Sequence, residues 1–150
     1  MMLRWLLASL HLLGLGIGLG AVWARGRALG GDLDRAGLRR VFLADTWWGV
    51  AAVLWIVTGL IRAFGGFEKG TAYYLHNTAF LVKMALFLVI LVLEVRPMVT
   101  LIQWRTRVGQ GEVPTSLPAA RAMARVSYLE AGLVVLMVLA AAAMARGLGV

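Results

Sequence analysis

Long apolar runs separated by short polar segments make up most of this chain. Four of the runs approach or exceed the roughly 20 mostly apolar residues that a helix needs to cross a bilayer. They cover residues 3–23, 41–64, 78–95 and 126–145. The pattern predicts four transmembrane helices. Because the connections between the runs are short, it favours an all-α integral membrane four-helix bundle of up-and-down topology.

Two of the runs have unusual ends. The third run is the shortest and is followed by Arg96 and Pro97, after which Val99–Trp104 has the pattern of a helix that continues into the interface. Proline lacks an amide proton and its ring clashes with the preceding turn, so we expect the helix to kink or restart at Pro97. The first run resembles a signal peptide in its basic start and small-residue end, but its length favours a retained span.

The composition agrees with a membrane protein and narrows the classes of function. Hydrophobic residues make up 61% of the 150 residues, and the mean hydropathy is +0.85, whereas soluble domains are about 45–50% apolar. We expect a single transmembrane domain over residues 1–150. The chain has no cysteine, so it contains neither a disulfide nor a thiolate metal site.

The chain is also strongly basic, with a formal net charge of +8. In a soluble protein this charge would indicate nucleic acid, but here the basic residues lie between apolar runs, where they set topology and contact anionic lipid. The expected partners are the lipid bilayer, anionic lipid at the basic connections and a second copy of the chain, with no nucleic acid. The sequence contains no phosphate-binding glycine loop, HExxH or CxxC motif.

Basic residues are distributed unevenly between the two sides of the predicted spans. The positive-inside rule places the connections after the first and third spans in the cytoplasm and both termini outside. Abundant Ala, Gly, Leu and Arg are typical of a bacterial gene of high GC content, so we expect the bacterial inner membrane. The first side holds ten basic residues: Arg25, Arg27, Arg35, Arg39, Arg40, Arg96, Arg105, Arg107, Arg121 and Arg125. The other side holds four: Arg4, Arg62, Lys69 and Arg146.

Five ionisable residues lie within or near the apolar runs: His11, Asp45, Lys83, Glu94 and Glu130. Ionisable residues inside a membrane are costly, and as a rule they face the bundle interior. Residues 7 or 11 positions apart lie on one face of a helix, because each residue turns the helix by about 100°. We therefore expect one inward stripe on each span. The stripes are Arg4, His11 and Gly18; Asp45, Gly49, Ala52, Ile56 and Gly59; His76, Lys83 and Glu94; and Met123, Glu130, Met137 and Met144.

An acidic layer is expected near the cytoplasmic ends of the spans. Asp45, Glu94 and Glu130 each lie about one turn from that boundary. Ion pairing with basic residues close by in sequence is the simplest interpretation, and a proton path is the alternative. The basic residues concerned are Arg39, Arg40, Arg96 and Arg125.

A second polar layer, near the outer side, holds His11, Lys83 and His76. Lys83 lies about 7–8 Å inside the bilayer, and no carboxylate of any predicted span lies at its depth. Its ammonium group must reach the outer surface, lose its proton or hold an anionic guest, unless Glu68 folds over it from the connection. The sequence leaves these alternatives open.

His11 is either an ordinary hydrogen-bonding residue or a ligand. Its span carries several glycines, which permit either close helix contact or the approach of a flat ligand to bare backbone. Imidazole, ammonium and bare backbone together would suit haem, which needs an axial nitrogen, a counter-charge for its carboxylate arms and a flat wall. The glycines are Gly14, Gly16, Gly18 and Gly20.

The stretch FEKGTAYYLHNTAFLVKMALFLVILVLEVRP, residues 67–97, resembles the signature of a bacterial membrane family catalogued as domain of unknown function 2214. The resemblance extends to LASLHLLG, LADTWWGVAAVLWIVTGLIR and AAAMARGLG. The chain is more distantly similar to four-helix membrane proteins of the HemJ-type protoporphyrinogen oxidases and the CopD-type copper-resistance proteins, in which a first-helix histidine and a third-helix lysine recur. That similarity implies haem-binding roles for His11 and Lys83. It departs at Leu81, where the pattern has a histidine.

These observations support one leading hypothesis of function and two alternatives. The first is a haem- or porphyrin-binding redox protein, in which His11 ligates the iron of haem b and Lys83 and His76 contact the cofactor. The second is a non-catalytic membrane subunit or scaffold, in which Lys83 reaches the surface. The third is a small transporter, although the sequence has no obvious inverted repeat or broken mid-membrane helix. Neither a reaction nor a catalytic residue follows from the sequence.

Overall fold

The computed structural model describes residues 2–66, 76–113 and 116–148. Within these ranges the chain forms four long helices and no strand. The helices are α1 (Met2–Leu29), α2 (Arg35–Phe64), α4 (Thr78–Gly109) and α5 (Leu117–Ala145). Each of them is long and apolar enough to cross a membrane. The prediction of an all-α four-helix membrane protein is therefore confirmed.

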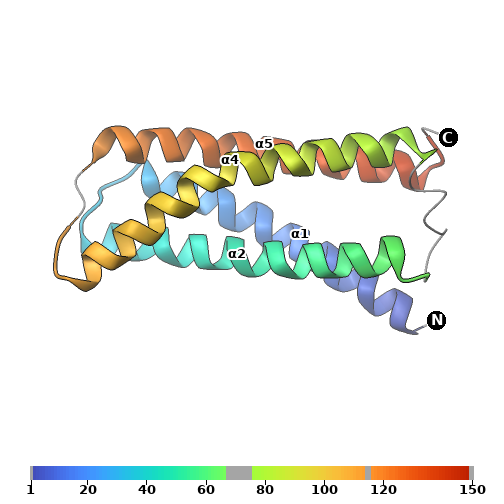
Figure 1. Ribbon diagram of the computed structural model, residues 1–150, viewed down its shortest axis with the longest axis horizontal. Coiled ribbons are helices and arrows are strands. Elements are labelled where there is room, and N and C mark those ends of the chain that lie inside the picture. The colour runs from blue at the N-terminus through green and yellow to red at the C-terminus, as the bar shows by residue number, and fades with distance from the viewer. Residues whose placement is uncertain (1, 67–75, 114–115, 149–150) are drawn as a thin grey trace.

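The helices run alternately in opposite directions, so the bundle has two different ends (Figure 1). Both termini lie at one end, which we call the terminal end. The joins from α1 to α2 and from α4 to α5 lie at the other end, which we call the connection end. Helix α1 packs against α2 and α5, and α5 packs against α4.

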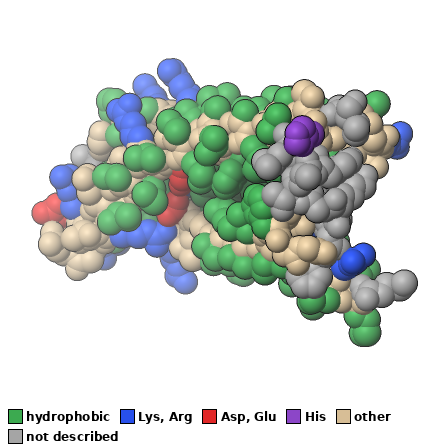
Figure 2. All heavy atoms as spheres, turned by 45° about the vertical axis from the view of Figure 1, so that its right-hand side comes forward, with side chains coloured by type: hydrophobic (Ala, Val, Ile, Leu, Met, Phe, Trp, Pro, Cys, Tyr) green, Lys and Arg blue, Asp and Glu red, His purple; other side chains and the backbone are tan. Residues whose placement is uncertain are grey.

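The surface of the bundle is largely apolar, as a bilayer requires. Only 11% of the most apolar 18-residue stretch of α4 is buried inside the bundle, and large side chains such as Leu88 and Val92 are exposed. Figure 2 shows hydrophobic side chains over the middle of one face, with Lys and Arg gathered mainly toward the connection end. Because lipid tails are as apolar as these side chains, helix association depends on close packing and polar contacts.

The helices extend beyond the apolar runs that predicted them. Helix α1 continues to Leu29, and α2 begins at Arg35. The Asp34 carboxylate accepts a hydrogen bond of 2.7 Å from the Gly37 amide, which satisfies one of the free donors at the start of α2. Hydropathy marks only the part of a helix that lies in hydrocarbon, so it does not locate these ends.

Helix α4 is continuous through Pro97. The predicted helical continuation over Val99–Trp104 is confirmed, and the proline causes a change of direction rather than a restart. Helix α4 lies beside α5 over its first part and then slants toward the beginning of α2 (Figure 1). A proline inside a helix removes one backbone hydrogen bond and favours such a bend.

Close contact between α1 and α2 depends on two glycines of α1. A Cβ atom at either Gly14 or Gly18 would lie 3.4 Å from an atom of α2, so a longer side chain would force the helices apart. At Gly16 and Gly20 a Cβ atom would meet nothing within 4 Å. The four glycines therefore divide into a packing pair and a pair with open space in front of it.

The inward face of α2 is offset from the predicted stripe. The stripe predicts that Gly49 faces inward, but Gly49 is exposed, and a Cβ atom there would meet nothing within 4 Å. The predicted stripe begins at Asp45. The Asp45 side chain is 18% exposed, and it enters the bundle from the edge of the buried face. The buried residues of α2 are Gly37, Leu38, Val41, Ala44, Trp48, Ala51 and Thr58.

Candidate functional site: a buried arginine cluster and a cationic cleft

Arg25 of α1 lies at the centre of a buried polar cluster, with its side chain 0% exposed. Its Nη1 donates to Asp45 Oδ1 at 3.0 Å and to Glu94 Oε1 at 2.7 Å. Its Nη2 donates to Glu94 Oε2 and Glu130 Oε2, both at 2.7 Å. Its Nε donates to Ser127 Oγ at 3.0 Å. One guanidinium group from α1 therefore binds α2, α4 and α5 together.

The guanidinium geometry explains why arginine suits this position. A planar group with five donors can bind a carboxylate through two parallel hydrogen bonds, as Arg25 binds Glu94, and still reach other acceptors. Arg105 of α4 supplies a second cation, and its Nη2 donates to Asp45 Oδ2 at 2.9 Å and to the Phe42 carbonyl at 2.9 Å. The cluster therefore joins two cations to three carboxylates.

Two apolar clusters enclose these charges along the bundle axis. One lies at the connection end and includes Leu38, Leu101 and Met123. The other lies toward the terminal end and includes Trp48 and Ile90. The Arg25–Glu130 pair, in which both side chains are 0% exposed, is therefore screened far less than a pair on a surface, whereas the Arg105 side chain is 38% exposed.

The predicted partners of the acidic layer were wrong. Sequence proximity favoured Arg39, Arg40, Arg96 and Arg125, none of which forms an ion pair with the acids among the described residues. The hydropathy pattern instead assigns Arg25 to a connection, because the first apolar run ends at residue 23. A signal was present: Arg4, His11 and Gly18 recur every seven residues, and the next position of that stripe is Arg25.

A cleft opens toward the terminal end of the bundle, beyond the second apolar cluster. It has two adjoining compartments of about 100 and 380 Å³. All four helices contribute to it, and both compartments are lined by His11 of α1 and Lys83 of α4. The residues shared by the two compartments are His11, Trp55, Gly59, Ala63, Phe80, Lys83 and Met137.

His11 is fixed in one orientation by Thr58 of α2. Its Nδ1 lies 2.9 Å from Thr58 Oγ1, and the Thr58 hydroxyl donates its single proton to the Leu54 carbonyl at 2.7 Å. The imidazole must therefore donate at Nδ1, which leaves Nε2 with a free lone pair. No residue in the described ranges forms a hydrogen bond with Nε2. Gly59 makes room for the ring, because a Cβ atom there would lie 3.2 Å from His11 Cε1.

Lys83 makes the cleft positively charged. Its Nζ lies 5.9 Å from the centre of the Trp55 ring, a cation–π distance, and among the described residues it has no ion pair or hydrogen bond. Arg62 also lines the larger compartment. Neither compartment has an aspartate or glutamate among its described lining residues. Glu68, which the sequence suggested as a cover for Lys83, lies outside the described residues.

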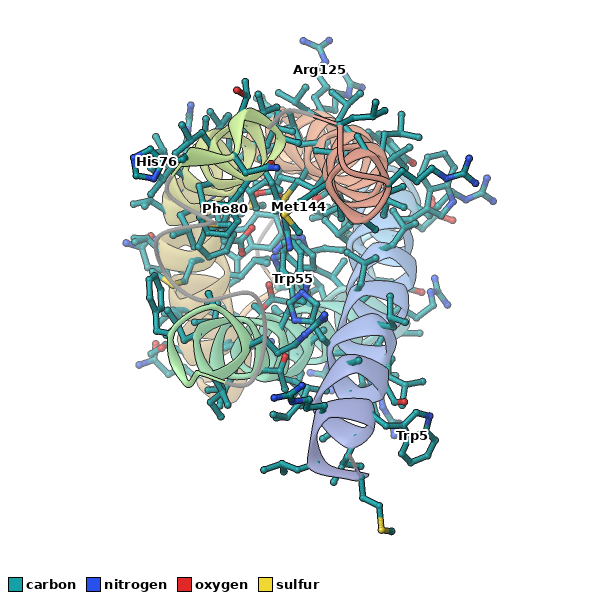
Figure 3. The ribbon with its side chains drawn as sticks, turned by 90° about the vertical axis from the view of Figure 1, so that its right-hand side faces the viewer. Trp5, Trp55, His76, Phe80, Arg125 and Met144 are labelled. Atoms are coloured by element: carbon teal, nitrogen blue, oxygen red, sulfur yellow. The ribbon has the colours of Figure 1, made fainter. Side chains whose placement is uncertain are left out.

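Aromatic rings form much of the cleft wall. Trp55 lies 5.7 Å from the His11 ring and meets Phe87 edge-on at 5.8 Å, centre to centre. The Trp55 Nε1 atom is buried without a hydrogen-bond partner among the described residues, which is costly for an indole donor. Viewed from the terminal end, Trp55 and Met144 point into the space between the helices, whereas Trp5 points outward (Figure 3).

His76 is not brought to the cleft. It is exposed, it is absent from the residues that line either compartment, and it lies on the outer side of α4 (Figure 3). The predicted stripe extended helical periodicity backwards from Lys83 to His76. Asn77 caps the helix by accepting the Phe80 amide proton at 3.0 Å, so His76 precedes the helix and does not follow its periodicity.

The described residues do not form a metal site made of protein side chains alone. These residues contain no group of three His, Cys, Asp or Glu placed to hold a metal ion. A metal bound at His11 would have to bring other ligands with it, as haem iron does.

Comparison with known protein families gives a match over nearly the whole chain. The family described as "Predicted membrane protein (DUF2214)" matches residues 3–149. No curated protein and no solved structure matches the chain significantly, so the comparisons do not show the predicted resemblance to the HemJ and CopD types. Because the match covers nearly the whole chain, the protein belongs to the DUF2214 family of predicted membrane proteins.

Proposed function

We propose that the cleft binds a flat, largely apolar and anionic ligand of the porphyrin class, with haem b as the candidate, and that the protein is a membrane-embedded haem-binding redox protein. One observation carries the proposal. His11, whose Nε2 has no described partner, shares an apolar cleft with Lys83, and no described acid lines that cleft. A cleft of this kind favours a ligand that has a metal or proton donor at its centre and negative charge at its edge.

The residues present fit the requirements of haem. The Thr58 hydroxyl holds His11 at Nδ1, in the way that outer-shell partners orient metal-bound histidines. Lys83 offers positive charge for carboxylate arms, and Trp55 offers a flat wall and a buried indole donor. Bound haem would supply an iron centre that carries one electron at a time. The protein would hold the group, orient it and exclude water from it.

A methionine rather than a second histidine would be the other side chain of the cleft able to bind the iron. Leu81 stands where the resembling proteins have a histidine, and its side chain is exposed. The thioether of methionine is the other common neutral ligand of haem iron. Among the described residues, three methionines line the cleft: Met84 in the smaller compartment, Met144 in the larger and Met137 in both.

The scaffold alternative makes a different prediction about the same residues. If the protein were only a membrane subunit, its stability would come from the Arg25 cluster and the packing glycines, and His11 and Lys83 would tolerate replacement without loss of any bound group. The transporter alternative would need a path that connects the cleft to the connection end. The Arg25 cluster and the second apolar cluster stand between them.

The proposal is tested by titrating the purified protein with haemin in mild detergent. Wild type should shift the haemin Soret band with a stoichiometry of one, and the His11→Ala variant should lose this shift. His76→Ala is the matched control, because it removes the other histidine of the chain from a position outside the cleft. Equal binding by His11→Ala and wild type would overturn the assignment of His11, and no binding by wild type would overturn the function.

A further inference from the structure

A groove between α1 and α2 lies on the outside of the bundle, apart from the cleft. Its volume is about 780 Å³. Gly16 and Gly20 line it near the middle of α1, and Trp23 and Trp47 line it from the two helices. Arg27 and Arg40 also line it, and since α1 ends and α2 begins at the connection end, both arginines lie toward that end.

We propose that this groove is a binding site for an anionic phospholipid. Arg27 and Arg40 hold the phosphate of the headgroup, and an acyl chain lies along the bare backbone at Gly16 and Gly20. The site is separate from the His11 cleft and does not depend on the proposed haem.

Charge is the first argument for this occupant. Neither Arg27 nor Arg40 forms an ion pair or hydrogen bond with any residue in the described ranges, whereas Arg25 and Arg105 are both paired. No aspartate or glutamate lines the groove among the described residues. Guanidinium groups bind phosphate oxygens through paired hydrogen bonds, and basic residues at a membrane surface attract anionic lipid.

The dimensions of the groove give a second argument. From Arg27 to Gly16 the helix rises about 16 Å, at 1.5 Å per residue. This is close to half of the roughly 30 Å hydrocarbon thickness of a bilayer, so an acyl chain that begins at the arginines would follow the groove through one leaflet. Trp23 and Trp47 are 54% and 50% exposed, and tryptophan side chains favour the interface between headgroups and hydrocarbon.

The open space in front of the glycines also needs an occupant. A Cβ atom at Gly16 or Gly20 would meet nothing within 4 Å, and glycines four residues apart often mark a contact between helices of two copies. A twofold contact would place the same surface of both copies together. That arrangement would bring unpaired arginines of like charge toward each other, whereas an anionic lipid complements them.

Native mass spectrometry of the full chain in detergent can test the site. The probes are phosphatidylglycerol, phosphatidylcholine with the same acyl chains, and inorganic phosphate. The Arg27→Gln/Arg40→Gln variant should bind phosphatidylglycerol about tenfold more weakly than wild type. The matched control is Arg121→Gln/Arg125→Gln, which removes the same charge from exposed positions of α5 outside the groove, and its affinity should stay within about threefold.

A second variant tests the groove without changing charge. Gly20→Leu should weaken the binding of both lipids because the side chain fills the acyl path, and it should fold because its Cβ atom meets no neighbour. Equal losses in the two double arginine variants would overturn the proposal, since binding would then follow net charge. So would competition by inorganic phosphate at the lipid's own concentration. A dimer that Gly20→Leu abolishes while lipid binding persists would overturn it as well, and would assign the groove to a second copy.

Discussion

Replacement of Arg25 by methionine is the most demanding structural prediction. The side chain is 0% exposed and makes five hydrogen bonds to four residues on three other helices: Asp45, Glu94, Ser127 and Glu130. Methionine keeps much of the length of the side chain but removes the charge, which leaves Glu130 buried without a cation. Removal of one partner from a buried ion pair costs about 3–5 kcal/mol. We expect a loss of unfolding free energy in this range.

The assay is equilibrium unfolding in mixed detergent micelles, followed by far-UV circular dichroism. Arg27→Met is the matched control, because Arg27 lies two positions further along α1 and forms no ion pair with a described residue. It should unfold like wild type. The double variant Arg25→Met/Glu130→Met should recover part of the lost stability, since a buried charge without a partner is removed along with its counter-ion. A destabilisation of less than about 1 kcal/mol in Arg25→Met would refute the reasoning.

Three further predictions concern the cleft and the helix packing. Lys83→Gln should weaken the binding of haemin but not of its dimethyl ester, as measured by Soret titration, because only the free acid carries carboxylates; equal losses for both ligands would exclude a charge role for Lys83. Thr58→Val should lower haemin affinity by about 10–100-fold through loss of the bond to His11 Nδ1, and unchanged affinity would show that this bond is unimportant. Gly18→Leu should lower the unfolding midpoint far more than Gly16→Leu, because a Cβ atom at Gly18 would lie 3.4 Å from α2 whereas one at Gly16 would meet nothing within 4 Å; equal midpoints would contradict the packing assignment.

The sequence was sufficient to predict the number and class of the helices. Four apolar runs correspond to four helices, and the continuation over Val99–Trp104 followed from its pattern. Helix ends were harder to predict because hydropathy reports the surrounding solvent rather than backbone hydrogen bonds. For this reason the hydropathy pattern assigns Arg25, two residues beyond the first run, to a connection. It does not assign Arg25 to the inward stripe of Arg4, His11 and Gly18, although Arg25 is the next position of that stripe.

The details of the site depended on contacts between helices. Periodicity predicted that His11 and Lys83 lie on the inward faces of their own helices, and in the structure both residues line the cleft. The predicted stripe of α2 included Ile56 and Gly59, which do line the cleft, but it missed Thr58, because the pattern of one helix does not fix its rotation against a neighbour. The bond from His11 to Thr58 was therefore missed. His76 was misplaced because the stripe was extended past the Asn77 cap.

The absorption spectrum of the protein as isolated tests the central claim most directly. The protein would be extracted in mild detergent from haem-replete cells, and its spectrum recorded oxidised and reduced, together with its iron content. We predict a Soret band, and α and β bands on reduction, with about one iron per chain in wild type and in His76→Ala and none in His11→Ala. A colourless, iron-free wild-type preparation would contradict the account of the cleft as a haem site.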